Sequence, residues 1–255
     1  MKKLKQFGQH FLNNIPLAKQ MVERIVSQSG CKNIVEVGPG EGVLTQFFLQ
    51  QPSINFKVVE IDNRLIELLP IKFPALAGKI IHADFLTVDL NEIFNGESFA
   101  LVGNFPYNIS SQIVFKALDN QGLVPFLAGM FQKEFADRVV SIPKKKAYGI
   151  PSVLVQLDYA TEQWFDVPPE AFTPPPKVWS SVISIIKKNE TQLEFDKKLF
   201  KNIVKTAFNN RRKMLRNTLS GFAITDCEAW EKMKTQRPEE LHFTEFITLT
   251  NLIQL

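Results

Sequence analysis

The sequence predicts a doubly wound α/β protein with a small helical domain at its C-terminal end. Two observations lead to this fold class. In residues 1–186, short apolar runs rich in β-branched and aromatic residues alternate with helical stretches, as in a mostly parallel sheet covered on both faces. Beyond residue 187 the strand pattern stops and helical periodicity takes over. We therefore expect two domains, residues 1–186 and residues 187–255.

Seven runs are expected to form the strands of one sheet. Five of them alternate with helices and should be parallel, namely Asn33–Val37, Phe56–Ile61, Lys79–His82, Ala100–Gly103 and Leu123–Phe131. The last two, Ser152–Tyr159 and Val178–Ile186, are joined by a Pro-rich connection without room for a crossover helix of ordinary length. We expect this pair to be antiparallel and to close a seven-stranded, mostly parallel sheet.

Three helices are expected after the sheet, over Asp196–Asn209, Lys213–Leu219 and Ile224–Met233. This region carries the excess of positive charge, because residues 187–255 contain 13 Lys and Arg residues against 9 Asp and Glu residues. Smaller basic clusters lie at residues 2–5 and 144–146. Clusters of this kind suit a phosphate backbone, although a solvated helix face produces the same pattern.

Composition limits the classes to which the protein can belong. With 45% hydrophobic residues the chain can bury a sizeable core, and no apolar run is long enough for a signal peptide or a membrane span. Cys31 and Cys227 form no Cys-x-x-Cys pair, and only three His residues accompany them. We expect a cytoplasmic protein with free thiols, without a metal site and without membrane association.

A glycine-rich turn and two carboxylates follow the first three expected strands. The turn reads Gly38-Pro-Gly-Glu-Gly42, which lacks the spacing of the dinucleotide motif Gly-x-Gly-x-x-Gly. Glu60 ends the second strand, where a carboxylate can accept hydrogen bonds from ribose hydroxyls, and Asp84 follows the third, where it could accept one from an adenine amine. Either carboxylate alone also fits an ordinary turn. Together they predict an adenosine-like ligand, and the lack of a phosphate loop argues against ATP.

The fourth expected strand ends in Asn104-Phe-Pro-Tyr-Asn-Ile-Ser110, on the same edge of the sheet as the ligand motifs. An amide and a phenol beside a proline can form a simple turn, or a small platform that holds a flat polar ring. The position of this segment at the ligand edge favours the platform.

In order and spacing, these motifs resemble those of S-adenosylmethionine-dependent RNA adenine N6-methyltransferases. Further segments narrow the resemblance to the KsgA-type family of 16S rRNA adenine dimethyltransferases, and they extend over nearly the whole chain. These segments are Gln6–Leu12, Gln132–Val139, Ala147–Gly149, Phe172–Val178 and Arg211–Leu219.

The resemblance implies a Rossmann-like class I methyltransferase fold, S-adenosyl-L-methionine as the cofactor and a monomeric enzyme. It also implies the substrate, which would be two adjacent adenosines in the 3′-terminal hairpin of 16S rRNA, methylated to N6,N6-dimethyladenosine on a precursor of the 30S subunit. Two alternatives stay open. One is a 23S rRNA adenine methyltransferase of the macrolide-resistance type, and the other is a non-catalytic RNA-binding assembly factor that retains the pocket.

The same resemblance assigns roles around the cofactor and the target base. A segment with His10 and Leu12 is expected to fold over the cofactor, and Asn104 and Pro106 are expected to hold the target amine through their carbonyl oxygens. Tyr107 is expected to stack on the base. The residues expected to line the cofactor pocket are Gly38, Glu60, Asp84 and Asn104.

Two further roles concern the RNA. Phe172, before a run of prolines, is expected in a stiff loop beside the target base. The residues expected to bind RNA phosphates, together with the N-terminal lysines, are Arg211, Arg212, Lys213 and Arg216, with Arg212 and Arg216 on one face of a helix.

Five positions differ from the usual family pattern. Phe105 stands where Leu or Ile is common, His10 where Asn is common, and Trp179 where an acidic residue is expected. Ile150-Pro151 replaces a polar continuation on a segment expected to face RNA. We expect Phe105 to face inward as packing.

Overall fold

The computed structural model describes residues 10–189 and 194–254, which form two compact units. The first, called the sheet unit, contains the described residues of Met1–Ala136 together with Glu162–Lys187. The second, called the helical unit, contains Asp137–Thr161 and the described residues of Lys188–Leu255. The chain passes from the sheet unit to the helical unit after Lys187, which agrees with the expected boundary near residue 187. The expected division is otherwise corrected, because Asp137–Thr161 groups with the C-terminal helices rather than with the sheet.

Hydrogen bonds inside the helical unit explain this grouping. The Tyr148 hydroxyl donates to the carbonyl oxygen of Leu241 at 2.8 Å, and the backbone N–H of Lys144 donates to the carbonyl oxygen of Glu239 at 2.8 Å. A buried phenol such as Tyr148 requires a partner for its hydroxyl. Because Tyr148 and Leu241 are 93 residues apart in sequence, no local sequence pattern could predict their hydrogen bond.

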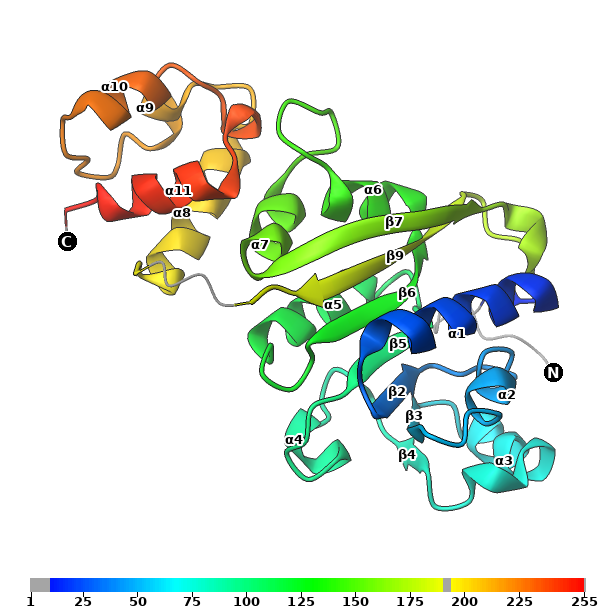
Figure 1. Cartoon of the computed structure of the whole chain (residues 1–255). Helices are drawn as coiled ribbons and strands as arrows, with labels where there is room; N and C mark the ends of the chain where they lie inside the picture. Colours follow the sequence, from blue (N-terminus) through cyan, green and yellow to red (C-terminus); the bar gives the residue numbers. More distant parts are fainter. Residues whose placement is uncertain (1–9, 190–193, 255) are drawn as a thin grey trace. The chain divides into compact units, whose positions relative to one another are not determined.

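The sheet has seven strands in the order β4-β3-β2-β5-β6-β9-β7 (Figure 1). The strands are β2 (Asn33–Val37), β3 (Asn55–Glu60), β4 (Ile80–His82), β5 (Ala100–Asn104), β6 (Phe126–Gln132), β7 (Tyr159–Val167) and β9 (Ser180–Lys187). Strands β2 to β6 are parallel, and β9 runs antiparallel to β6. The five expected parallel strands are thus confirmed, with bounds that differ by a few residues at most.

The strand order sets the place of a ligand site. From β2 the chain proceeds to β3 and β4 on one side, and then returns to β5 and β6 on the other side. The crevice between the carboxyl ends of β2 and β5 is therefore the topological switch point, where open α/β sheets bind ligands.

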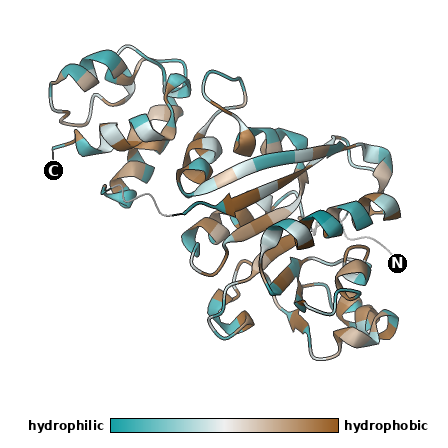
Figure 2. Cartoon of the chain, in the orientation of Figure 1, coloured by the Kyte–Doolittle hydropathy of each residue, from teal (hydrophilic) through white to brown (hydrophobic). Residues whose placement is uncertain are grey.

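One expected strand is wrong, because Ser152–Asp158 lies in the helix α7 (Ile150–Asp158) and only Tyr159 begins a strand. The run Ser152–Val155 is buried. A short buried helix and a buried strand have the same kind of continuous apolar sequence, so the sequence pattern does not distinguish them. Pro151 in the first turn and the hydrogen bond from Gly149 N to Ser152 Oγ at 3.0 Å favour the helix. The strand beside β9 is β7, which Figure 2 shows to be more hydrophilic than β9 and which therefore has no apolar run.

The remaining helices are α1 (Ile15–Ser29), α2 (Thr45–Phe48), α3 (Asn63–Lys72), α4 (Leu90–Ile93), α5 (Ser110–Asp119), α6 (Lys133–Val140), α8 (Lys197–Asn209), α9 (Leu215–Thr218), α10 (Glu228–Met233) and α11 (Phe243–Asn251). Asn14 caps the N-terminus of α1 with its side chain, which accepts a hydrogen bond from Leu17 N, and the helix face with Met21 and Ile25 packs in the core of the sheet unit. Asp196 caps α8 as the expected bounds require.

Two other expectations from composition can be compared with the structure. Cys31 and Cys227 are free thiols. None of the helices in the described part of the chain combines the length and the apolar character that a bilayer crossing requires.

Candidate active site

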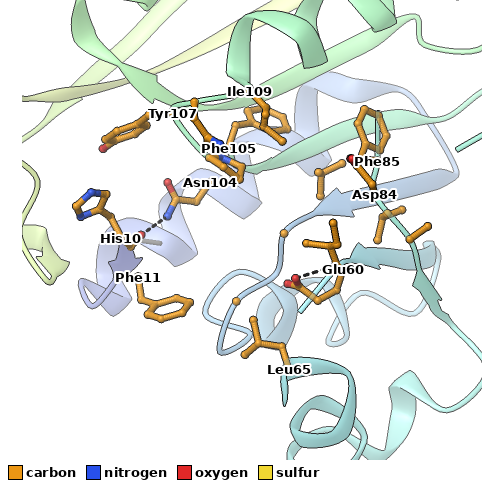
Figure 3. A pocket seen from close by; sticks show the side chains of 18 residues that line it. His10, Phe11, Glu60, Leu65, Asp84, Phe85, Asn104, Phe105, Tyr107 and Ile109 are labelled. Carbon is orange, nitrogen blue, oxygen red and sulfur yellow. Dashed lines mark hydrogen bonds between the residues drawn. The ribbon is translucent and has the colours of Figure 1, made fainter. Parts of the chain in front are cut away.

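A cavity of about 280 Å³ lies at the carboxyl ends of β2, β3, β4 and β5, at the switch point of the sheet (Figure 3). Its walls come from segments that are far apart in sequence. They include His10, Gly38, Glu60, Asp84, Asn104 and Tyr107. The structure therefore brings together most of the residues that the sequence places in one ligand site.

The glycine-rich turn after β2 forms one wall of this cavity. Gly38, Gly40 and Gly42 have φ values of 65°, 58° and 82°, a region that favours glycine. A Cβ atom on Gly40 would lie 2.8 Å from the ring of Phe11, which is too close for a normal contact, so glycine is also favoured here for steric reasons. The turn consequently presents bare backbone to the cavity, which allows a ligand to approach closely.

Glu60 closes β3 and is only 5% exposed. Its Oε1 atom accepts hydrogen bonds from the backbone N–H groups of Ile61 and Asp62 at 2.8 and 2.9 Å, which orients the carboxylate at the cavity wall. Burial raises the pKa of Glu60 despite these hydrogen bonds. A ligand that donates hydrogen bonds to this carboxylate would therefore stabilise its charged form.

Asp84 and Phe85 follow β4 and line the next part of the cavity. The Oδ1 atom of Asp84 accepts a hydrogen bond from Leu86 N at 2.9 Å. The ammonium group of Lys116 donates to the carbonyl oxygens of Phe85 and Val88 at 2.8 and 2.6 Å, and so holds this loop in place. A carboxylate beside an aromatic ring suits a flat, amine-bearing heterocycle.

Asn104 ends β5 and Tyr107 follows three residues later, so both reach the same cavity (Figure 3). The Asn104 side-chain N–H donates to the carbonyl oxygen of His10 at 2.9 Å. The hydroxyls of Tyr107 and Ser180 lie 2.5 Å apart, and burial raises the pKa of Tyr107. The carbonyl oxygen of Pro106 accepts a hydrogen bond from Ile109 N at 3.2 Å, which closes the turn of the platform.

Phe105 faces inward as expected and is 1% exposed. Its ring lies 4.9 Å from that of Phe131, measured between centroids. A Cβ atom on Gly129 would come within 2.2 Å of the Phe105 ring, so that the glycine makes room for a side chain larger than the usual Leu or Ile.

The imidazole of His10 covers one face of Tyr107, which the sequence did not reveal. The two rings are stacked, with centroids 5.5 Å apart and planes 24° apart, and Nδ1 of His10 lies 2.8 Å from the carbonyl oxygen of Pro174. A third ring between them would require a separation of about 7 Å, because stacked atoms stay about 3.5 Å apart. A base that stacks on this face of Tyr107 must therefore displace His10.

Two expected site residues are buried. Leu12 and Phe172 are 4% and 2% exposed and face each other in a two-stranded sheet of β1 (Phe11–Leu12) and β8 (Phe172–Thr173). Phe172 packs in the core and does not line the cavity, whereas Leu12 lines a neighbouring hollow together with Gly38 and Asn104. Phe11 lines the cavity in place of Leu12, as the alternation of side chains along a strand requires.

The basic residues expected to bind phosphates differ in their surroundings. Arg211 is engaged within the helical unit, where it pairs with Glu239 and donates to the carbonyl oxygen of Lys146 at 2.7 Å. Arg212, Lys213 and Arg216 are exposed. The expected helix with Arg212 and Arg216 on one face is wrong, because α9 begins only at Leu215 and Arg212 lies in the preceding turn. The lysines at positions 2, 3 and 5 lie outside the described residues.

Two solved structures share the fold of the chain. A dimethyladenosine transferase from Plasmodium falciparum matches with a TM-score of 0.77 and 22% identity, over 96% of this chain and 100% of that chain. The 23S rRNA methyltransferase ErmE matches with a TM-score of 0.70 and 23% identity, over 94% of this chain and 99% of that chain. The class I methyltransferase fold expected from the sequence is therefore confirmed.

Sequence comparisons place the chain more narrowly. Proteins named ribosomal RNA small subunit methyltransferase A are similar over its whole length. The one from Flavobacterium johnsoniae is 44% identical over 100% of this chain and 97% of its own length, and the one from Bacteroides fragilis is 45% identical over 100% and 93%. The family model of ribosomal RNA adenine dimethylases matches residues 1–252. The chain belongs to the ribosomal RNA adenine dimethylase family.

Proposed function

We propose that the protein transfers methyl groups from S-adenosyl-L-methionine to N6 of two adjacent adenosines in the 3′-terminal hairpin of 16S rRNA. The products are N6,N6-dimethyladenosine and S-adenosylhomocysteine, and the substrate is a precursor of the 30S subunit in the cytoplasm, on which the protein acts as a monomer. One observation supports this proposal above all. The platform residues Asn104 and Tyr107 line the same cavity as Gly38, Glu60 and Asp84.

The first half of this cavity fits an adenosine bearing a short charged chain. We assign Glu60 to the ribose hydroxyls, because its carboxylate is held at the wall by backbone hydrogen bonds. Asp84 and Phe85 receive the adenine ring, and the positive-φ turn Gly38–Gly42 admits the remainder of the molecule close to its backbone. S-Adenosyl-L-methionine bound there supplies a sulfonium methyl group that a nucleophile can attack.

The second half positions the target amine. The lone pair of an adenine amine is delocalised into the ring, so that this amine is a poor nucleophile. The side-chain carbonyl of Asn104 and the backbone carbonyl of Pro106 accept its two hydrogens and favour a pyramidal nitrogen. The nitrogen lone pair then forms the new C–N bond, the electrons of the C–S bond go to sulfur, and the amine loses one proton to solvent. The protein contributes alignment and electrostatic stabilisation rather than a strong base.

Tyr107 completes the platform as a stacking face. A base inside an RNA stack cannot reach the cavity, so that the target adenosine has to be flipped out and held by an aromatic side chain. The hydrogen bond between the hydroxyls of Tyr107 and Ser180 holds the outer end of the phenol in place. We assign phosphate contacts outside the cavity to the exposed side chains of Arg212, Lys213 and Arg216, whereas Arg211 organises the helical unit.

The deciding experiment uses purified 30S subunits that lack the modification, labelled S-adenosyl-L-methionine and mapping of the methylated positions. We expect label at two adjacent adenosines near the 3′ end of 16S rRNA. Label in 23S rRNA instead would favour the macrolide-resistance activity. Failure to bind S-adenosyl-L-methionine in calorimetry, with folded protein, would favour a non-catalytic assembly factor.

A further inference from the structure

Trp179 is a large aromatic residue that the cavity does not use. It lies directly before β9 and is 50% exposed, and it occupies a position where the family resemblance leads one to expect an acidic residue. Exposure of half a Trp side chain leaves much apolar surface in water, which suggests a contact that the isolated chain lacks.

Trp179 precedes the residue that contacts the platform for the target base. Its neighbour Ser180 bears the hydroxyl that meets the Tyr107 hydroxyl at 2.5 Å. Its own carbonyl oxygen accepts a hydrogen bond from Lys133 N at 2.9 Å, and Ser180 pairs with Gln132 at the end of β6. The Trp side chain therefore stands at the carboxyl edge of the sheet, one residue away from the partner of Tyr107.

A groove of about 630 Å³ opens at Trp179, and the charges of the described residues that line it cancel. Lys133 and Lys177 supply two positive charges, whereas Glu134 and Asp166 supply two negative charges, and Lys133 forms an ion pair with Asp166 at 3.0 Å. A groove without net charge does not suit a phosphate group. An aromatic face beside the side-chain amide of Gln132 suits a nucleobase, because every base has a face that stacks and an edge that forms hydrogen bonds.

We propose that Trp179 forms a second stacking subsite, which holds the base of a nucleotide that flanks the pair of target adenosines. This inference rests on the proposed function and extends it. Flipping one base out of a strand removes a stacking partner from its neighbour, and a second aromatic face at the same edge of the sheet replaces that partner. Trp179 is thus a positioning residue for RNA and makes no contact with the reacting atoms.

The first test compares variants of this exposed side chain on unmethylated 30S subunits. Trp179→Ala should raise KM for the subunit by about 5- to 100-fold, the effect of losing one stacked base, with a smaller change in kcat. Trp179→Phe, which keeps an aromatic face, should restore most of the affinity, whereas Trp179→Leu should not. The control is Ile71→Ala, which removes another exposed apolar side chain of the sheet unit, 79% exposed on α3, and should leave KM unchanged.

The second test identifies the partner of Trp179 by a double-mutant cycle. Subunits are reconstituted with 16S rRNA in which a ligated synthetic 3′ segment carries an abasic nucleotide on the 5′ or the 3′ side of the target pair. If Trp179 stacks on one of these bases, Trp179→Ala should not raise KM any further for the substrate that lacks this base. If Trp179→Ala raises KM by the same factor for the intact substrate and for both abasic substrates, the inference is overturned.

The outcomes separate this inference from the proposed function. If the wild-type protein binds S-adenosyl-L-methionine but methylates no position of the subunit, the proposed function fails. If the wild-type protein is active and Trp179→Ala has the same KM as the wild type, only the stacking subsite is refuted. Calorimetry with S-adenosyl-L-methionine should give the same affinity for all Trp179 variants.

Discussion

The two halves of the cavity are held in different ways. The half formed by the Gly38–Gly42 turn, Glu60 and Asp84 depends on hydrogen bonds to nearby backbone groups, such as those from Ile61 and Leu86. The half formed by Asn104 and Tyr107 depends on His10 and Ser180, which are 94 and 73 residues away in sequence. The first half is therefore ready for its ligand, whereas the second is covered by a side chain of the protein itself and has to open.

The largest effect is expected from the base half. Asn104→Ala removes the side-chain carbonyl that accepts a hydrogen of the target amine, and kcat should fall by about 100-fold or more. Single-turnover methyl transfer to unmethylated 30S subunits measures this loss. The control is Asn63→Ala at an exposed position on α3. A full rate for Asn104→Ala would exclude the amide from catalysis.

The next largest effect is expected in the half of the cavity formed by the Gly38–Gly42 turn, Glu60 and Asp84, and it tests whether the turn already has the shape that the ligand requires. Gly40→Ala and Gly78→Ala both place a Cβ on a backbone with positive φ, 58° and 71°, but only the first meets an obstacle, the ring of Phe11 at 2.8 Å. Gly78→Ala should lower the free energy of unfolding by about 1 kcal/mol, and Gly40→Ala should lower it by more because of this contact. Only Gly40→Ala should weaken S-adenosyl-L-methionine binding, by about 10-fold or more, as measured by calorimetry. Equal affinities for the two variants would show that the turn tolerates a wider shape.

A third prediction concerns the buried carboxyl group beneath the turn. Burial, together with the negative charge of Glu60, raises the pKa of Glu36 to about 8 against the hydrogen bond from Thr45. The folded state therefore binds this proton more tightly than the unfolded state, in which the carboxyl group has its ordinary pKa of 4.5. The contribution of the proton to stability is complete below that ordinary value and is lost as pH rises to about 8.

Denaturant unfolding at pH 5 and pH 8 checks this contribution. The wild type should lose about 1 kcal/mol or more over that range, whereas Glu36→Gln, which has no proton to release, should lose less. Glu41→Gln, at an exposed position in the same turn, should retain the pH dependence of the wild type. A wild type and a Glu36→Gln variant with identical pH profiles would contradict the shifted pKa.

The smallest effect should come from uncovering Tyr107. His10→Ala removes the imidazole that occupies the stacking face and keeps the backbone carbonyl that binds Asn104. Because a stacked aromatic pair contributes about 0.5 to 1.5 kcal/mol, KM for the 30S subunit should fall by about 2- to 10-fold. His82→Ala, at an exposed position at the end of β4, is the control. An increase in KM would mean that His10 holds the RNA instead of giving way to it.

The same contrast explains which features could be predicted from the sequence. The parallel strands and the residues at their ends were predictable, because an apolar run followed by Gly38, Glu60 or Asp84 is a local pattern. The inward direction of Phe105 was predictable because a large ring in an apolar setting has to be buried. The exchange of helix for strand at Ser152–Asp158 was not, since a buried run lacks the periodicity that separates the two.

Other features depend on contacts that no local pattern carries. Phe172 is buried because it faces Leu12, 160 residues earlier in the chain, and the stacking of His10 on Tyr107 is of the same kind. The engagement of Arg211 by Glu239 likewise requires the helical unit to be folded. Alternation along β1 was the one available signal, since burial of Leu12 turns Phe11 towards the cavity.

The insertion of Asp137–Thr161 into the helical unit limits how the chain can be divided. Three crossings, after Ala136, Thr161 and Lys187, connect the units. Truncation after Lys187 would leave Tyr148 without the carbonyl oxygen of Leu241 and Lys144 without that of Glu239. The C-terminal helices are thus no interchangeable module, and a chimera that exchanges them with those of a relative must replace residues 137–161 at the same time.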